Sequence, residues 1–130
     1  MDSKINIASF EEGFELQRAV VAALAKQDIK IENFADSDKA PELLKSVITA
    51  MSLHILGDKD VLKALWVCLG RCLYNGQKIT IDIFEKEENR KDFVPVAISC
   101  IEVNIEPFIN GLFSAWKSIN PTPILEGNPK

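Results

Sequence analysis

Apolar side chains recur every three or four residues through most of this chain of 130 residues. This spacing is that of one face of an α-helix, so it favours a fold that is mainly α. The clearest stripe lies between Asp58, which can cap a helix, and the turn pair Asn75-Gly76. Its apolar members are Leu62, Leu65, Trp66, Leu69, Cys72 and Leu73. We therefore predict a helix that begins after Asp58 and is stopped by Asn75-Gly76.

Two further helices are predicted before this one. Ser9 and Glu12 have the spacing of a capping box, so a first helix is expected at about residues 10–26. Pro41 suits the first turn of a second helix, because its missing N–H would have no partner there. Gly57 is a suitable left-handed cap at its end. The stripe of this second helix consists of Leu44, Val47, Ile48, Met51 and Ile55.

A fourth apolar stripe continues through two prolines. It consists of Phe93, Ala97, Cys100, Ile101, Asn104, Phe108 and Leu112. A proline inside a helix removes one hydrogen bond and clashes with the preceding turn. We therefore expect a long helical stretch that is kinked near Pro95 and broken or restarted at Pro107, with Asn104 as a cap of the restart.

Two short segments alternate between polar and apolar residues, which is typical of strands. They lie at residues 28–34 and 78–83, and together they predict a small β ribbon beside the helices. The second segment could instead pair with residues 5–7. It also has the spacing of a helix start at Asp82 and Glu85, so strand and helix both stay open for 78–83.

The predicted fold is a compact bundle of about four to five helices in one domain, residues 1–119. A chain of this length can bury a single core, and 47% of its residues are hydrophobic. Residues 120–130 read Asn-Pro-Thr-Pro-Ile-Leu-Glu-Gly-Asn-Pro-Lys, which is rich in residues that oppose regular structure. We predict that this segment is a mobile C-terminal tail.

The charge and the first residues restrict the class of partner. The formal charge is −4 and the basic residues are not clustered, so no nucleic-acid partner is expected. No export signal is recognised at the N-terminus, and the longest apolar candidate, residues 47–56, is too short to span a bilayer. We expect a cytoplasmic protein without a membrane partner. Its three cysteines, an odd number, are interpreted as reduced core thiols.

Residues able to carry catalysis or bind a metal are few. Cys68, Cys72, Cys100 and His54 could in principle complete a zinc site, but these cysteines lie inside apolar stripes where thiols pack as small hydrophobes. A cysteine or serine nucleophile would depend on the same single histidine. The glycines are scattered and form no phosphate loop. The charged run at residues 85–92 has mixed signs, as a solvated helix face has. We therefore expect no enzymatic activity, no metal and no cofactor.

Aromatic residues give a stronger lead to function. A helix that starts at Pro107 would carry Phe108, Phe113 and Trp116 together with other apolar residues on more than one side. Such a helix is buried either in its own core or against another chain. Aromatic anchors often carry binding energy at interfaces, although Trp116 covering the domain's own core is an equal alternative. The candidate partner-binding residues are Trp66, Tyr74, Phe84, Phe108, Phe113 and Trp116.

Several short elements occur in an order that resembles the tail assembly chaperones of long-tailed bacteriophages and prophages. The resemblance spans about residues 10–116 and is densest at 64–113. Its elements are Arg71, Tyr74, Asn75-Gly76, Lys78-Ile79-Thr80, Phe84-Glu85, Arg90 with Phe93, Val103-Asn104 and Pro107-Phe108. Phe10 and residues 16–20 are similar to the first helix of that family. The cysteines and the linker at 28–40 depart from the family pattern.

The resemblance implies a helical protein in the cytoplasm of the bacterial host. Such a protein binds the tape measure protein and keeps it soluble until tail tube subunits polymerise around it, and it is absent from the mature virion. A frameshifted longer form often recruits the tail tube protein, and the segment after residue 119 is a suitable place for such an extension. Self-association that hides apolar surface is expected when no client is bound. The alternative is a small helical adaptor or regulatory module that dimerises through Phe113 and Trp116 and has no role in tails.

Overall fold

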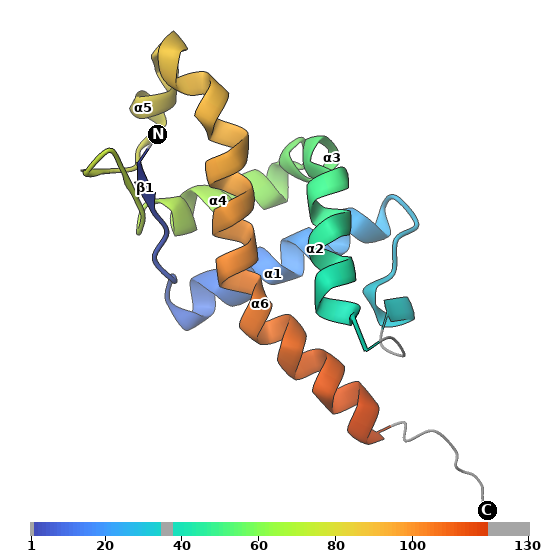
Figure 1. Ribbon diagram of the computed structural model, residues 1–130. Helices are drawn as coiled ribbons and strands as arrows, with labels where there is room; N and C mark the ends of the chain where they lie inside the picture. Colours follow the sequence, from blue (N-terminus) through green and yellow to red (C-terminus); the bar gives the residue numbers. More distant parts are fainter. Residues whose placement is uncertain (1, 35–37, 120–130) are drawn as a thin grey trace, which may run out of the picture.

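A computed structural model of the chain describes residues 2–34 and 38–119, and it confirms a mainly helical bundle with a small β ribbon (Figure 1). The strands are β1 (Ser3–Lys4), β2 (Leu73–Tyr74) and β3 (Gln77–Lys78). The helices are α1 (Phe10–Ala25), α2 (Ala40–Ala50), α3 (Ser52–Leu56), α4 (Lys59–Leu69), α5 (Ile81–Glu85) and α6 (Phe93–Ile119), with 3₁₀ turns at Ile31–Phe34 and Glu87–Asp92. The predicted tail at 120–130 lies outside the described residues, and the division at residue 119 stays a prediction.

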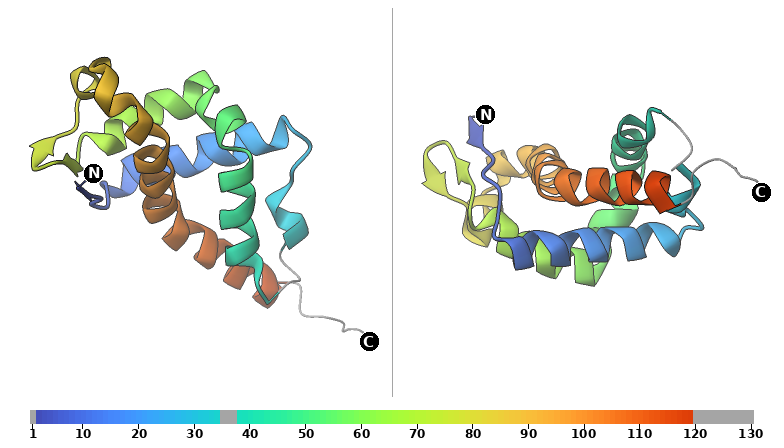
Figure 2. Two further views of the ribbon diagram at one scale, coloured as in Figure 1. Left: turned by 45° about the horizontal axis from the view of Figure 1, so that its top comes forward. Right: turned by 90° about the horizontal axis from the view of Figure 1, so that it is seen from below.

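The core lies where three helices meet. α1 and α4 lie side by side, and α6 crosses them in a second layer with α2 packed along its C-terminal half (Figure 2). The apolar stripes face this junction, as fully buried Leu16, Val20 and Leu65 show. Burying each such side chain stabilises the fold by about 1.5–3 kcal/mol before chain entropy is counted.

The start of α1 is fixed by the predicted capping box. The Ser9 hydroxyl accepts from the Glu12 N–H at 3.3 Å, and the Glu12 carboxylate accepts from the Ser9 N–H at 3.2 Å. Arg71 pairs with the same carboxylate at 3.0 Å. Arg71 first, and then Ser9, hold the pKa of Glu12 below its usual value. Glu12 therefore connects the first turn of α1 to Arg71 in the segment after α4.

Close approach between α1 and α6 depends on Gly13. A Cβ atom there would lie 3.3 Å from Cε2 of Phe108 and 3.5 Å from the backbone oxygen of Asn104. These distances are close to the limit of van der Waals contact. A glycine inside α1, which costs helix stability elsewhere, is explained here by the crossing of the two helices.

The β ribbon forms mostly from other residues than those predicted, and it shares only Lys78 with the two predicted segments. β1 pairs antiparallel with β2, and β2 pairs with β3. Asn75 and Gly76 join the last two strands with φ of 50° and 83°, the positive values that a two-residue type I′ hairpin requires. Asn75 also exchanges hydrogen bonds with Asp2, which fixes the N-terminal strand on the hairpin edge.

The strand predicted at 28–34 is wrong. Asp28 has a left-handed φ of 61°, and Ile31–Phe34 is a 3₁₀ turn whose Ile31 enters the core. For residues 78–83, the strand and the helix predictions each hold for part of the segment, because Lys78 is the last residue of β3 and Ile81 is the first residue of α5. The strand that pairs with β2 is β1, at the N-terminal end of the chain, and not the segment at 28–34.

Two helices are shorter than predicted. The helix expected from Pro41 to Gly57 is divided at Met51 into α2 and α3, and Figure 1 shows α3 turning away from the axis of α2. The helix after Asp58 ends at Leu69 with Gly70 as its cap, because the following residues are recruited into the ribbon. The predicted stripes are right in both cases, but the boundaries are set by contacts with distant residues.

The prolines of α6 act differently from the prediction. Pro95 is the third residue of the helix, where the missing N–H removes little, so the kink predicted there is wrong. Pro107 lies inside α6, and the helix continues through it with a change of direction visible in Figure 1. The restart and its cap are therefore also wrong. Asn104 is instead buried at the crossing with α1.

Asp58 is expected to stabilise α4 as its N-cap. Its carboxylate accepts from the N–H groups of Asp60 and Val61 at 3.0 and 3.1 Å, and it pairs with Lys26 at 2.7 Å. Replacing Asp58 by alanine is expected to lower the free energy of unfolding by about 0.5–2 kcal/mol in urea denaturation. An unchanged midpoint for Asp58→Ala would contradict the role of the cap.

The same carboxylate predicts a dependence on pH. Lys26 first, and then the Val61 N–H, lower the pKa of Asp58 in the folded chain. The stabilisation is therefore complete above the unfolded pKa, near ~3.9, and is lost as the pH falls through the lower folded value. Asp58→Asn keeps an acceptor for the cap but removes this dependence, so the difference from the wild type should shrink in acid.

Candidate functional site

The six predicted partner-binding residues do not form one surface. Trp66, Tyr74 and Phe84 lie in one aromatic cluster with Phe93, whereas Phe108 and the pair Phe113 and Trp116 lie farther along α6. Three of the six are buried in the chain's own core, with exposed fractions of 4% for Tyr74, 8% for Phe84 and 4% for Phe113. Trp66, Phe108 and Trp116 are half-buried and are the ones that reach the surface.

The first cluster joins the hairpin to the start of α6. The Tyr74 hydroxyl donates to Asp92 at 2.5 Å and lies 3.1 Å from Asn89. The hydrogen bond with Asp92, followed by burial, raises the pKa of Tyr74. The ring of Trp66 stacks on Phe93 at 5.6 Å, and together with Ile81 these residues line a shallow hollow on the surface. The cluster is therefore mainly structural, with one exposed apolar edge.

A second cluster is formed by three phenylalanines and is open to solvent. Phe10 and Phe14 lie one turn apart on α1, with ring centroids 6.0 Å apart, and each lies 5.6 Å from the ring of Phe108. Phe10 is 72% exposed and Phe14 is 47% exposed. Offset and edge contacts of this kind hold the rings in place without hiding them. The cluster is a preformed apolar surface.

Leu112 and Trp116 extend this surface along α6. They lie one and two turns after Phe108, and both are half-buried. We call Phe10, Phe14, Phe108, Leu112 and Trp116 the aromatic stripe. Its neighbours on α1 are charged and solvated, as the exposed pair of Glu15 and Arg18 shows. An apolar surface with a charged rim is typical of a site that binds another polypeptide.

Sequence reasoning identified Phe108 and Trp116 but not Phe14, and it gave Phe10 only as an element of the resemblance. A signal for both was present. Phe10 and Phe14 are four residues apart and lie outside the core-facing stripe of α1. Two large aromatic residues beside, rather than within, the core face of a helix indicate a second contact surface.

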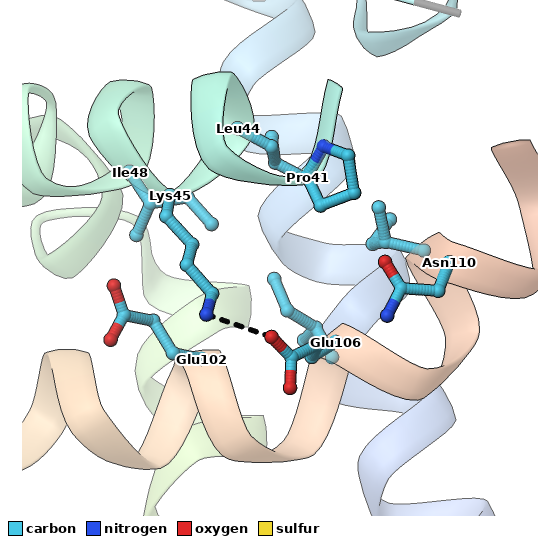
Figure 3. Close-up of a pocket in the computed structure, with 9 residues that line it drawn as sticks. Pro41, Leu44, Lys45, Ile48, Glu102, Glu106 and Asn110 are labelled. Carbon is cyan, nitrogen blue, oxygen red and sulfur yellow. Dashed lines mark ion pairs between the residues drawn. The ribbon is translucent and has the colours of Figure 1, made fainter. Parts of the chain in front are cut away.

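The cavity between α2 and α6 does not resemble a catalytic site (Figure 3). Its lining includes the apolar residues Leu44, Ile48, Ile105 and Ile109 and the polar residues Lys45, Glu102, Glu106 and Asn110. Lys45 of α2 and Glu106 of α6 pair at 2.8 Å at its edge. The cavity volume is about 20 Å³, far below the usual range for small-molecule sites. It is better explained as incomplete packing between two helices.

The thiols lie in the core. Cys68, Cys72 and Cys100 are each fully buried, and His54 is exposed on α3. Burial raises the pKa of Cys68 to about 11. A hydrogen bond with Cys100 lowers the pKa of Cys72, but this sulfur is fully buried. Within residues 2–34 and 38–119, no group of three histidine, cysteine or carboxylate side chains could hold a metal ion.

The structure contains an apolar helical run that is longer than residues 47–56, the longest apolar candidate predicted from the sequence. Residues Glu87–Trp116 are long and apolar enough, by length and composition, to cross a membrane. In the structure, α6 contacts α1, α2 and α4, and its Ile101 and Ile105 are buried among them. Its place at the centre of the core accounts for its apolar composition.

No family model matches the chain, and no curated protein or solved structure matches it either.

Proposed function

We propose that the chain is a tail assembly chaperone of a long-tailed bacteriophage or prophage. It binds the tape measure protein, keeps it soluble until the tail tube polymerises, and is absent from the mature virion. The observation that carries this proposal is the aromatic stripe, an exposed surface on which apolar residues follow helical spacing. An amphipathic client helix can lay its own apolar face along such a surface.

The size of the surface fits a chaperone that must release its client. Phe10 and Phe14 expose 72% and 47% of their surface, so burying both removes roughly 240 Å² from water. That area stabilises a complex by about 6 kcal/mol, while association costs about 4–15 kcal/mol. One stripe therefore binds weakly. Several copies along a long client supply affinity through repeated contacts, each of which dissociates readily.

The elements that resemble the family have structural roles that agree with this proposal. Asn75-Gly76 forms the turn of the hairpin, and the Tyr74 hydroxyl donates to Asp92 in the segment before α6. Asn104 accepts from Ala8 in the segment between β1 and α1, which we call the N-terminal arm. Phe108, at the end of the resembling elements, reaches the surface beside Phe10. The resemblance thus includes both residues that set the fold and two members of the stripe, Phe10 and Phe108.

The proposal is tested by co-expression with the tape measure protein encoded in the same phage or prophage genome. The client should be insoluble alone and soluble with the chaperone, and the two should co-purify. Purified virions should lack the chaperone in mass spectrometry. A client that stays insoluble under co-expression, or a genome without a neighbouring gene for a very long helical protein, would contradict the proposal.

The alternative function is a helical adaptor that dimerises through Phe113 and Trp116. In the structure these two residues expose less surface for a dimer contact than this alternative requires. Phe113 is buried by its own chain, and its ring packs on Trp116 at 5.7 Å. An adaptor would therefore need to use the aromatic stripe as well. Sedimentation of the chain without client distinguishes a stable dimer from the weak self-association expected of a chaperone.

A further inference from the structure

We propose that the aromatic stripe continues on α6 into a hole beside Gly111, and that this hole receives one leucine-sized side chain from a helix of the client. The inference rests on the proposed function in treating the stripe as part of the client site. It adds the point of closest contact and the kind of helix that fits there.

The outward side of α6 carries no charge in its C-terminal half. Residues 107–116 contain no acidic or basic side chain, although Pro107, Gly111, Ser114 and Ala115 are exposed. A solvated helix face is normally charged or polar. The other long helices follow this rule, with exposed Arg18 on α1, Lys45 on α2 and Lys63 on α4. This part of α6 therefore has the composition of a surface that another polypeptide covers.

Gly111 lies at the centre of that uncharged side, and the packing of the chain itself does not account for it. At 100° per residue, Gly111 is opposite the buried Ile109 and Phe113. Glycine weakens the interior of a helix. At Gly13 the crossing with Phe108 explains the glycine, whereas a Cβ atom at Gly111 would meet no described atom within 4 Å. The open space at Gly111 lets a side chain or backbone from outside approach closely.

The neighbours of Gly111 complete a hole for a side chain. In helix packing, a knob from one helix enters a hole formed by four residues at i, i+3, i+4 and i+7 of the other. The residues at this spacing are Phe108, Gly111, Leu112 and Ala115, which we call the Gly111 hole. Phe108 and Leu112 are half-buried and form its apolar wall, while Gly111 and Ala115 are exposed and leave room.

The hole is continuous with the exposed part of the stripe. Phe108 belongs to both, and its ring lies 5.6 Å from the rings of Phe10 and Phe14. Figure 1 shows α6 continuing past its crossing with α1 towards its C-terminal end. A helix that lies along this half of α6 can therefore fill the hole with one side chain and contact the phenylalanines with the next turn.

The charges around the hole define the partner helix. A charged side chain buried in the hole would have no partner there, which is costly, so the contact face of the client is apolar. Glu11 follows Phe10 on α1, is exposed, and forms no ion pair among the described residues. Lysine or arginine at the edge of the client helix would complement it. A second copy is less suitable, because each copy carries a formal charge of −4.

The test uses two synthetic helical peptides, each about 18 residues long, with leucine along one face and lysine elsewhere. The second peptide has alanine in place of the central leucine. In fluorescence anisotropy titrations the wild type should bind the leucine peptide about tenfold more tightly, because one buried leucine is lost. Gly111→Leu fills the hole and should bind the leucine peptide about tenfold more weakly than the wild type does. The two peptides should then differ by less than about twofold on this variant.

The stability of the variants separates a filled hole from a damaged fold. Gly111→Leu should raise the midpoint of urea denaturation, because leucine is a better helix former and no described atom opposes its Cβ. Gly111→Ala adds one methyl group, so it should also raise the midpoint and weaken peptide binding by less than about threefold. Ser46→Leu is the matched control, since Ser46 is exposed on α2, and it should leave binding unchanged.

The outcomes are distinguishable from those for the proposed function. Equal affinity of the wild type for the two peptides would overturn the inference, and so would undiminished binding by Gly111→Leu. A Gly111→Leu defect seen only in sedimentation of the chain alone would also overturn it, because a second copy would then be the occupant. Selective binding of the leucine peptide supports the hole even if the tape measure protein stays insoluble under co-expression. That combination would reject the proposed function instead.

Discussion

Replacing Asn104 by alanine is expected to lower the free energy of unfolding by about 2–4 kcal/mol, a large effect for one polar side chain. Asn104 is fully buried where α6 crosses the N-terminal arm. Its side-chain oxygen accepts from the Ala8 N–H at 2.7 Å, and its amide donates to the Cys100 carbonyl at 2.9 Å. Alanine leaves the Ala8 N–H without its acceptor and opens a cavity, and each loss costs about 1–3 kcal/mol.

The measurement is urea denaturation followed by circular dichroism, with hydrogen exchange of the Ala8 amide as a local readout. Asn110→Ala is the matched control, because Asn110 is exposed on the same helix and its replacement should change stability by less than about 0.5 kcal/mol. Exchange at Ala8 should accelerate in Asn104→Ala and not in the control. Equal stability of the two variants would show that Asn104 does not hold the arm.

The behaviour of Asn104 illustrates which parts of the fold can be predicted from the sequence. The apolar stripes of α1, α4 and α6 and the capping box at Ser9 each depend on residues close together in the sequence. They can therefore be predicted from the sequence alone. Asn104 instead depends on Ala8, which is 96 residues earlier. The local pattern of Asn104 followed by Pro107 predicts a helix cap. It contains no information about the N–H of Ala8, which is the actual donor to Asn104.

The strand predicted at 28–34 is wrong for the same reason. Alternation of polar and apolar residues suggested a strand at 28–34, but strands exist only where a partner is available. β1 reaches β2 across about seventy residues and occupies the hairpin edge. The two-residue strands have too few side chains to give a periodic signal. The Asn75-Gly76 turn was visible in the sequence, and it marked the hairpin better than the alternation did.

The aromatic stripe could be predicted only in part. Phe108 and Trp116 were identified because they follow Pro107 in an apolar helix. Phe113 lies in the same apolar segment of sequence, but its side chain lies near α2 and is buried. Which of three neighbouring aromatic residues reaches solvent depends on the direction of α6 after its bend. Phe10 joins the surface only because α1 crosses α6 at that point.

The second large effect is expected for the variant Phe10→Ser with Phe14→Ser, which should weaken binding of the tape measure protein by about 30-fold or more. Interface aromatic residues of this kind contribute about 1 kcal/mol or more each, so the two together contribute about 2 kcal/mol or more, and 1.4 kcal/mol corresponds to tenfold. Both rings are substantially exposed in the free chain, so the loss of folding stability should be small by comparison. Phe108→Ala and Trp116→Ala should weaken binding in the same direction.

Leu53 provides the matched control, since it is 78% exposed on α3 and lies outside the aromatic stripe. Leu53→Ser removes a similarly exposed apolar side chain, so unchanged client binding there would show that position, not general hydrophobicity, decides the interaction. Changes of charge at Glu87 or Lys91 should also have little effect, because exposed charges contribute at most about 1 kcal/mol. If sedimentation and pull-down are unchanged in every stripe variant, the client site lies elsewhere. The exposed edge around Trp66 and Ile81 would then be the next surface to substitute, because it is a hollow with aromatic walls.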